Sequence, residues 1–335
     1  MNRILRTAAM AVSAAVVSTS IAACSSVNSA DSSGSTAPES VNIIVPADPG
    51  GGWDQTGRAF SEVLTEEKIV KKASVGNVPG AGGTVGLAQL ANERDPNTLM
   101  IMGLVMVGAI ETNKSATKLA DTTPIAKLTE EQEVIVVPSE SKYHTITDLV
   151  EDIKANGQDV AIAGGSAGGT DQILAGQLLK ASGVPAGDIA KSLNYVPFDG
   201  GAESVTALLG GKVDAGISGV GEYAEQIKAG KLRALAVSGE EPSGLLPDVP
   251  TLTDEGIDLV LTNWRGIVAP GDLDDAERDA LTDVVTKAAE SDAWQKVLEA
   301  NDWDDAYMAG AEFETYVEEE VTSAQTTLKE IGLVQ

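Results

Sequence analysis

The segment Gly164-Gly-Ser166-Ala-Gly168 places a serine in a pattern that could support nucleophilic catalysis. It matches the G-x-S-x-G turn that exposes a nucleophile between a strand and a helix in α/β hydrolases, where a histidine farther along the chain acts as general base. The sequence has one histidine, His144, and it precedes Ser166. A serine hydrolase built on Ser166 is therefore the less favoured alternative, because it lacks a base in the expected chain order.

Residues for other kinds of catalytic or cofactor chemistry are missing from the sequence. Counting from Gly80, the glycine cluster continues with Gly82 and then has Val85 where the dinucleotide-binding fingerprint needs its third glycine. There is no Gly-Lys-Thr/Ser phosphate loop and no group of Cys and His with zinc-site spacing. The sequence therefore predicts a protein that is not an enzyme, with no catalytic residue, metal or cofactor.

Four glycine-rich segments have a composition that suits binding rather than catalysis. They are residues 49–52, 79–83, 164–169 and 199–201. Glycine lets backbone N–H groups approach a ligand because no Cβ intervenes, and a helix N-terminus adds about half a positive charge. The four segments are therefore predicted to bind an anion through their backbone amides.

The residues predicted to bind this ligand come from the four segments and their flanks. Ser166, Thr170 and Asn77 can donate hydrogen bonds to a carboxylate. Thr170 has an alternative role, which is to cap the helix that follows it. The predicted set is Pro49, Gly50, Gly51, Gly52, Trp53, Asp54, Asn77, Gly80, Ala81, Gly82, Gly83, Thr84, Ser166, Ala167, Thr170, Gln172, Asp199 and Gly200.

Three residues in or near these segments have structural alternatives. Asp54 falls in the first turn of a predicted helix, where a carboxylate favours the helix dipole and can cap, and this role is preferred to ligand contact. Arg265 is a candidate counter-charge for an anion, but a surface salt bridge explains it equally well. Trp53 either walls the site or seals the edge of its lobe.

The glycine segments must be positioned by the elements around them, and each follows an apolar run and precedes a helical pattern. The predicted strands are residues 41–45, 73–77, 99–102, 133–137, 160–163, 193–196, 213–217, 232–237 and 266–268. The predicted helices are residues 53–64, 84–94, 146–155, 171–182 and 202–209, with a helical tail from residue 274. Such alternation is typical of mostly parallel α/β sheets wound by helices, which bind ligands at the carboxyl ends of their strands.

The N-terminal residues predict export. Arg3 and Arg6 precede an apolar stretch that ends in small residues before Cys24, so residues 1–23 are predicted to be a signal peptide. Cys24 is the only cysteine, and its position resembles the lipidated cysteine of a bacterial lipoprotein; the alternative is an ordinary secretory signal with an incidental cysteine. Residues 24–40, rich in Ser, Ala and Gly, are predicted to form a flexible tether.

Length and charge limit the architecture and the partners. The remainder of the chain is long for one core and is predicted to form two lobes, residues 41–137 plus 263–335 and residues 138–262. The net charge of −27 makes nucleic acid a poor partner. It does not exclude an anionic ligand, because exposed charges are screened beyond about 8 Å at physiological salt.

Together the segments VPADPGGGWDQTGRA, NVPGAGGTVG, GGSAGGTDQILAG and WRGIVAP resemble the tripartite tricarboxylate transporter substrate-binding proteins, also called the TctC or Bug family. The resemblance implies a two-lobed, type II periplasmic-binding-protein fold, a "Venus flytrap" that closes on a di- or tricarboxylate such as citrate. It also implies delivery of this ligand to a transporter with one large and one small integral membrane subunit. The expected location is extracytoplasmic, either lipid-anchored to the outer face of the cell membrane or periplasmic, and the expected state is a monomer.

The same resemblance assigns the ligand contacts to residues 49–54, 79–84 and 166–170. Many members carry histidine where this chain has Gln172, so the resemblance leaves the ligand's identity open. An amino acid, an aromatic acid or a phosphate-like anion is the alternative within binding proteins.

Overall fold

The structure, a computed structural model, describes residues 38–198 and 201–334. The predicted signal peptide and the predicted positions Cys24, Asp199 and Gly200 lie outside the described residues. Among the residues described, no helix combines the length and the apolar character needed to cross a bilayer.

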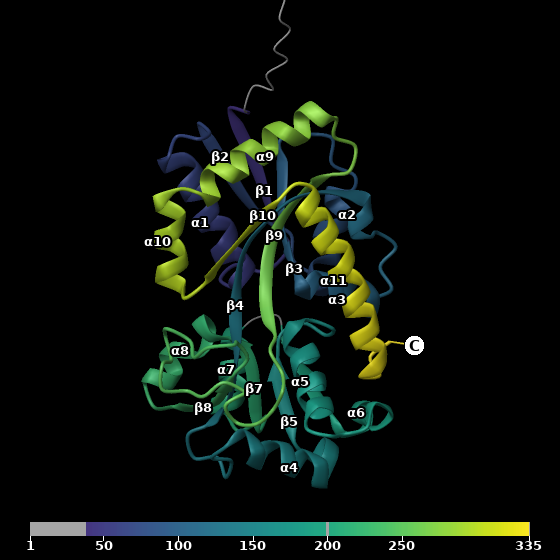
Figure 1. The fold of residues 1–335 in the computed structure, drawn as a ribbon, viewed down its shortest axis with the longest axis vertical. Coiled ribbons are helices and arrows are strands. Elements are labelled where there is room, and N and C mark those ends of the chain that lie inside the picture. Colours follow the sequence, from purple (N-terminus) through teal and green to yellow (C-terminus); the bar gives the residue numbers. More distant parts are fainter. Residues whose placement is uncertain (1–37, 199–200, 335) are drawn as a thin grey trace, which may run out of the picture. The chain divides into compact units, whose positions relative to one another are not determined.

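Strands and helices alternate along most of the chain (Figure 1). The strands are β1 Ser40–Val45, β2 Lys72–Asn77, β3 Thr98–Gly103, β4 Thr122–Pro138, β5 Ala161–Gly164, β6 Asn194–Pro197, β7 Ala215–Gly219, β8 Leu232–Val237, β9 Thr262–Pro270 and β10 Asp304–Ala309. The α-helices are α1 Gly52–Glu66, α2 Thr84–Leu90, α3 Leu104–Thr112, α4 Ile146–Asn156, α5 Thr170–Ala181, α6 Ala186–Ser192, α7 Gly201–Leu209, α8 Val220–Lys228, α9 Asp275–Ala289, α10 Asp292–Asn301 and α11 Ala311–Glu330. Short 3-10 helices are η1 Ala81–Gly83, η2 Leu119–Asp121 and η3 Gly157–Asp159.

The strands join in the order β2-β1-β3-β9-β4-β7-β5-β6, and β8 and β10 also pair with β4. Pairing is parallel among β1, β2 and β3 and among β5, β6 and β7. The pairs made by β4 and β9 are antiparallel, because one strand carries the chain into the second lobe and the other brings it back. The fold is therefore the predicted two-lobed α/β fold, with parallel strands in each lobe and antiparallel strands between the lobes.

Strand β4 is shared by both lobes. Its residues 122–132 pair with β9, whereas residues 133–136 pair with β7. Figure 1 shows β4 and β9 running side by side from the upper group of elements toward the lower group. This pair of strands connects the two lobes.

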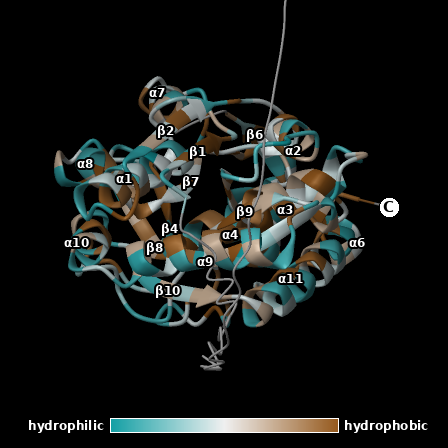
Figure 2. Ribbon diagram, turned by 90° about the horizontal axis from the view of Figure 1, so that it is seen from above, coloured by the Kyte–Doolittle hydropathy of each residue, from teal (hydrophilic) through white to brown (hydrophobic). Residues whose placement is uncertain are grey.

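Hydrophobic side chains pack into separate cores in the two lobes. The first core includes Phe60, Trp264 and Trp294, and the rings of Phe60 and Trp294 meet edge to face at 5.6 Å between centroids. The end of α11 reaches the other lobe, because Leu328 and Ile331 belong to the second core. In Figure 2, α10 and α11 show both hydrophilic and hydrophobic residues, as expected for helices that cover a core.

The structure differs from the prediction in several places, and helices α3, α6 and α8 were not predicted. Helix α3 follows β3 directly and is apolar on nearly all sides, so it has no helical periodicity to identify it. The prediction of a continuously helical tail is wrong, because β10 separates α10 from α11. Strand β4 begins at Thr122, well before the predicted residue 133, since charged residues such as Lys127 and Glu131 interrupt its apolar pattern.

Candidate functional site

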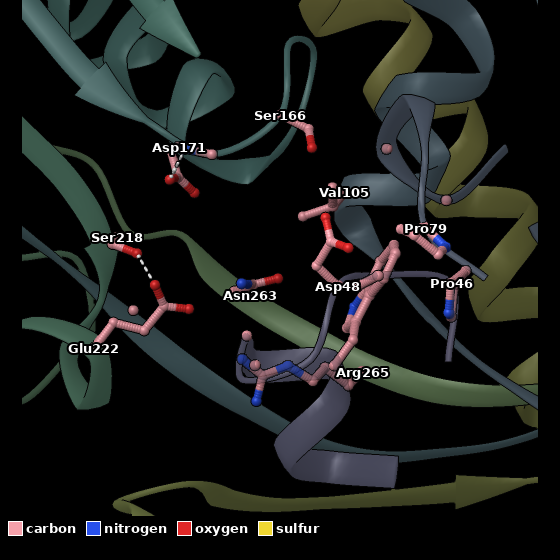
Figure 3. Close-up of a pocket in the computed structure, with 18 of the residues that line it drawn as sticks. Pro46, Asp48, Pro79, Val105, Ser166, Asp171, Ser218, Glu222, Asn263 and Arg265 are labelled. Atoms are coloured by element: carbon pink, nitrogen blue, oxygen red, sulfur yellow. Dashed lines mark hydrogen bonds between the residues drawn. The ribbon is translucent and has the colours of Figure 1, made fainter. Parts of the chain in front are cut away.

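A cavity of about 120 Å³ lies between loops of the two lobes (Figure 3). The first lobe contributes the segments after β1 and β2, the start of α1, one residue of α3, and β9. The second lobe contributes the segment after β5, the starts of α5, α7 and α8, and the end of β7. The described residues that line it are Pro46, Ala47, Asp48, Gly51, Gly52, Trp53, Pro79, Gly80, Ala81, Gly82, Gly83, Val105, Gly165, Ser166, Asp171, Ser204, Ser218, Gly219, Glu222, Asn263 and Arg265.

In the described part of the chain, helices that begin at the cavity lack side-chain caps, among them α1, α5 and α8. Gly51, Gly169 and Gly219 precede α1, α5 and α8, and glycine has no side chain to accept a helix N–H. Helices α4 and α9 begin elsewhere and are capped by the side chains of Thr145 and Asp274. A helix N-terminus without a cap leaves N–H groups and the positive end of its dipole available to an anion.

The first glycine segment presents such N–H groups. No described residue accepts a hydrogen bond from the N–H of Gly51, Gly52 or Trp53. A Cβ added to Gly51 would meet no atom within 4 Å, whereas one added to Gly52 would lie 2.5 Å from Nη2 of Arg265. Gly51 therefore faces open space, and Gly52 leaves room for the arginine.

Asp54 holds this segment in place. It is 4% exposed, and its carboxylate accepts hydrogen bonds from the N–H of Gly50 at 2.9 Å, from Nε of Arg58 at 2.9 Å and from Nδ2 of Asn77 at 2.8 Å. Burial acts to raise the pKa of Asp54, but the hydrogen bonds from Arg58 and Asn77 lower it below its ordinary value. Neither Asp54 nor Asn77 lines the cavity, so both support the segment that does.

The second glycine segment has a backbone that favours glycine. Gly80, Ala81, Gly82 and Gly83 have φ angles of 127°, 51°, 61° and 88°, all in the positive region. The N–H groups of Ala81 and Gly82 have no acceptor among the described residues. This turn therefore adds two free donors to the cavity wall.

Trp53 both walls the cavity and packs against the second segment. Its side chain lines the cavity and the residue is 8% exposed. A Cβ added to Gly83 would lie 2.7 Å from Cζ3 of Trp53, so glycine is needed for this close approach. The indole thus holds the first two segments together.

The third glycine segment is tied to helix α5. The N–H of Gly168 donates to Oε1 of Gln172 at 2.7 Å, and Oγ1 of the buried Thr170 donates to Oδ1 of Asn263 at 3.1 Å. Neither Gln172 nor Thr170 lines the cavity, although Ser166 does. Two predicted ligand contacts are therefore used within the protein.

The third segment also contacts α3 of the other lobe. A Cβ added to Gly108 would overlap the carbonyl oxygen of Gly168. Oγ1 of Thr112 donates to the carbonyl of Ala167 at 3.4 Å. These contacts between the lobes show that the structure is closed, and they place Ala167 beside α3 instead of in the cavity.

Arg265, on β9, lines the cavity but already has a charged partner. Its side chain is 3% exposed, and Nη2 donates to the carboxylate of Glu131. Nε1 of Trp303 donates to the other oxygen of this carboxylate at 2.9 Å, and the guanidinium lies 4.9 Å from the Trp303 ring centroid. The alternative of a surface salt bridge is wrong, because this ion pair is buried; Nε of Arg265 has no partner among the described residues.

Two carboxylates line the opposite wall, as Figure 3 shows. Oδ2 of Asp171 accepts the N–H of Gly165 at 2.6 Å, and Oε2 of Glu222 accepts Oγ of Ser218 at 2.9 Å. Burial, opposed by the hydrogen bond from Gly165 and reinforced by the charge of Glu222, raises the pKa of Asp171 to about 7. This wall of the cavity is therefore acidic.

A third acid lies behind this wall. Glu133 is completely buried, does not line the cavity, and has no hydrogen-bond partner for either carboxylate oxygen among the described residues. Burial and the nearby charges of Asp171 and Glu131 raise the pKa of Glu133 well above its ordinary value. Burial and these neighbouring charges therefore favour the protonated form of Glu133.

The structure brings part of the predicted set together at one cavity. Gly51, Gly52, Trp53, Gly80, Ala81, Gly82, Gly83 and Ser166 line it. The predicted residues that do not line it are Pro49, Gly50, Asp54, Asn77, Thr84, Ala167, Thr170 and Gln172, and Asp199 and Gly200 lie outside the described residues.

The lining residues that the sequence did not indicate are mostly polar side chains of the second lobe and of β9. Asp171, Ser218, Glu222 and Asn263 all line the cavity but were not predicted. The available signal was an acidic residue in the first turn of α5, directly after a glycine segment. Such a residue is more often a stabiliser of the helix dipole, so the sequence alone gives it no binding role.

The chain matches one family along most of its length. A model of the family described as "Tripartite tricarboxylate transporter family receptor" (TctC) matches residues 58–333. The chain is also 28% identical over 244 residues to protein BugT of Bordetella pertussis, which covers 70% of this chain and 71% of BugT.

Solved structures show the same fold. The periplasmic binding protein BugD matches with a TM-score of 0.77 at 23% identity, covering 89% of this chain and 99% of BugD. MatC of Rhodopseudomonas palustris, with bound malate, matches with a TM-score of 0.72 at 20% identity, covering 86% of this chain and 98% of MatC. An R. palustris protein with adipate matches with a TM-score of 0.76 at 19% identity, covering 88% of this chain and 98% of that one.

Proposed function

Because the chain belongs to the tripartite tricarboxylate transporter receptor family, whose members are extracytoplasmic solute-binding receptors and not enzymes, we propose that it captures a small di- or tricarboxylate, such as citrate, between its lobes. The observation that carries this proposal is the set of free N–H groups at the cavity, from Gly51, Gly52, Trp53, Ala81 and Gly82. Family membership removes the hydrolase alternative, and Ser166 is left as a hydroxyl that donates to the ligand.

The free donors are numerous enough for useful affinity. A hydrogen bond to a charged group contributes about 1.5–3 kcal/mol net, and association costs roughly 4–15 kcal/mol. About half a dozen such bonds can therefore offset the cost of association and leave a binding free energy near −8 kcal/mol, which corresponds to a micromolar dissociation constant. The ligands of the similar R. palustris structures, malate and adipate, support a small carboxylate as the substrate class.

We further propose that the closed protein delivers its ligand to a membrane transporter with one large and one small subunit. Closure is driven by the ligand, because only the closed state surrounds it with donors from both lobes. A lipid on Cys24 would hold the receptor, as a monomer, at the outer face of the membrane beside that transporter. The family description supports the transporter as partner.

Ligand-dependent stabilisation tests the binding proposal. We expect the melting temperature of the purified protein to rise with the concentration of at least one of citrate, malate, succinate, adipate, aspartate or glutamate, because binding to the native state stabilises it by mass action. Calorimetry with the best ligand then gives its affinity. An unchanged melting temperature across this panel at millimolar concentrations would contradict the proposed function.

A further inference from the structure

The two sides of the cavity offer opposite chemistry. On one side are the N–H groups of the first two glycine segments, which have no acceptor among the described residues and suit an anion; the carboxylate of Asp48 also lies on this side but is exposed to solvent. On the other side are the carboxylates of Asp171 and Glu222 (Figure 3). A ligand that touches both sides must therefore satisfy donors at one end and acceptors at the other.

The protein leaves part of each carboxylate unused. Asp171 and Glu222 each accept one hydrogen bond from a neighbour through one oxygen. The other oxygen of each has no donor from another described residue. Asp171 is 7% exposed, so little bulk water is available to solvate that oxygen once the lobes close.

Among the residues that the structure describes, no free cation balances this acidic wall. Arg265 is the only basic side chain among the described lining residues, and it is bound to Glu131. A ligand with negative charge alone would therefore face the carboxylates of Asp171 and Glu222 without a free cation to offset their charge. Repulsion between such like charges disfavours binding.

Independent evidence for a ligand acceptor comes from β9. Arg265 is 2% exposed and lines the cavity, and its Nε has no partner among the described residues. Asn263 is 8% exposed, also lines the cavity, and uses its Oδ1 to accept from Thr170, which leaves its Nδ2 to donate. Both groups are donors, so a ligand that fits this site has a hydrogen-bond acceptor beside β9.

We propose that the ligand is a small amino carboxylate, whose carboxylate binds the N–H groups of the first two glycine segments and whose ammonium group binds Asp171 and Glu222. This inference rests on the proposed function and narrows its substrate class. The cavity of about 120 Å³ restricts the ligand to a small molecule. Amino acids of the size of aspartate carry both groups, a carboxylate for the N–H donors and an ammonium group for the acidic wall.

Matched ligand pairs test the inference. Calorimetry at pH 8 compares aspartate with succinate, glutamate with glutarate, and aspartate with N-acetylaspartate, which keeps the carboxylates but loses the positive charge. We expect an amino member to bind at least about tenfold more tightly than its uncharged partner, because hydrogen bonds between charged groups would be lost. Equal or tighter binding of the plain carboxylate would overturn the inference and leave the proposed function intact, whereas no binding by either member of every pair would count against both.

Variants assign the ammonium contact. Asp171→Asn and Glu222→Gln keep an oxygen for their protein donors but lose the charge, so we expect each to reduce the preference for the amino ligand about tenfold. Glu225→Gln, at an exposed position of the same helix as Glu222, should keep the wild-type preference. An unchanged preference in both cavity variants would overturn the assignment.

Discussion

Titration of the Asp171 carboxyl group makes the stability of the protein depend on pH. Its pKa is raised from an ordinary 3.8 to about 7 by burial and by Glu222. Between these two values the folded protein holds a proton that the unfolded chain has released. The free energy of unfolding of the ligand-free protein therefore falls as pH rises through this window.

Replacing Asp171 removes the contribution of this group to the pH dependence. Asp171→Asn keeps an oxygen for the N–H of Gly165, and we expect the variant to exceed the wild type in stability at pH 8 by as much as about 4 kcal/mol. The difference should be small at pH 4, where the wild-type group is protonated in the folded state. Urea unfolding of ligand-free protein at both pH values measures it, with the exposed Asp159→Asn as control. Equal stability of the wild type and Asp171→Asn at pH 8 would show that ionisation of Asp171 does not destabilise the folded protein.

The sequence identifies backbone donors better than side-chain partners at this scale. Gly51, Gly82 and Ser166, which line the cavity, were predicted because four glycine segments each follow a strand and precede a helix, where backbone N–H groups can bind an anion. Asp171 and Glu222 were missed because an acid in a first helical turn has an ordinary structural role. Their direction into the cavity depends on how two lobes pack, which no local pattern contains.

Among the elements, the uncapped start of α1 offers a direct test of binding by backbone amides. Gly51 has φ −82° and ψ 172°, a conformation open to any residue, and an added Cβ meets no atom within 4 Å. Gly51→Val should therefore fold normally while its side chain crowds the ligand, and we expect at least about tenfold weaker binding. Calorimetry with the best ligand provides the measurement.

The matched control for this variant lies on β2. An added Cβ at Gly76 also meets no atom within 4 Å, and Gly76 is exposed and does not line the cavity. Gly76→Val should keep wild-type affinity. Wild-type affinity in Gly51→Val as well would remove the first segment from the site.

A helix or strand could be predicted where its sequence shows a regular pattern of apolar residues. Strands β1 and β8 and helix α4 were located from short apolar runs and from helical periodicity. Helix α3 was missed because it is buried on nearly all sides, and the first half of β4 because its charged residues are paired within the sheet region, as Lys127 is with Glu130. Both failures come from tertiary contacts that override local composition.

For the whole molecule, closure depends on the absence of a side chain at Gly108. Alanine there favours helix α3 by about 1 kcal/mol, but its Cβ would overlap the carbonyl of Gly168 in the other lobe. We expect Gly108→Ala to be folded and more open, with weaker ligand binding and a larger radius of gyration by solution scattering in saturating ligand. Gly187→Ala, in helix α6 where an added Cβ meets nothing within 4 Å, is the control. Wild-type affinity and wild-type compaction in Gly108→Ala would contradict a closed binding state of this geometry.

The proposed anchor concerns the molecule in its membrane. We expect Cys24→Ser to move the protein from the membrane fraction to the soluble extracytoplasmic fraction, because one lipidated cysteine would be its attachment. Fractionation followed by immunoblotting measures the change, with Ser25→Ala as control. Retention of Cys24→Ser in the membrane fraction would mean that another part of the chain holds it there.

The division into lobes 41–137 plus 263–335 and 138–262 is still a proposal, and the hydrophobic cores depart from its boundaries in two places. Strand β4 changes neighbours at Glu133, so Val134 and Ile135 already pack in the second lobe. Leu328 and Ile331, at the end of the chain, pack there too. Sequence patterns show that two lobes exist but not where a shared strand or a returning helix changes sides.

The position of β9 has a consequence for biosynthesis. This strand lies between β3 and β4 in the sheet, although the entire second lobe separates it from them in sequence. A nascent chain therefore has no partner for the middle of its first sheet until most of the polypeptide has left the ribosome, and pairings this distant form slowly. We therefore expect the first sheet to be completed only late in folding, after the second lobe has been synthesised.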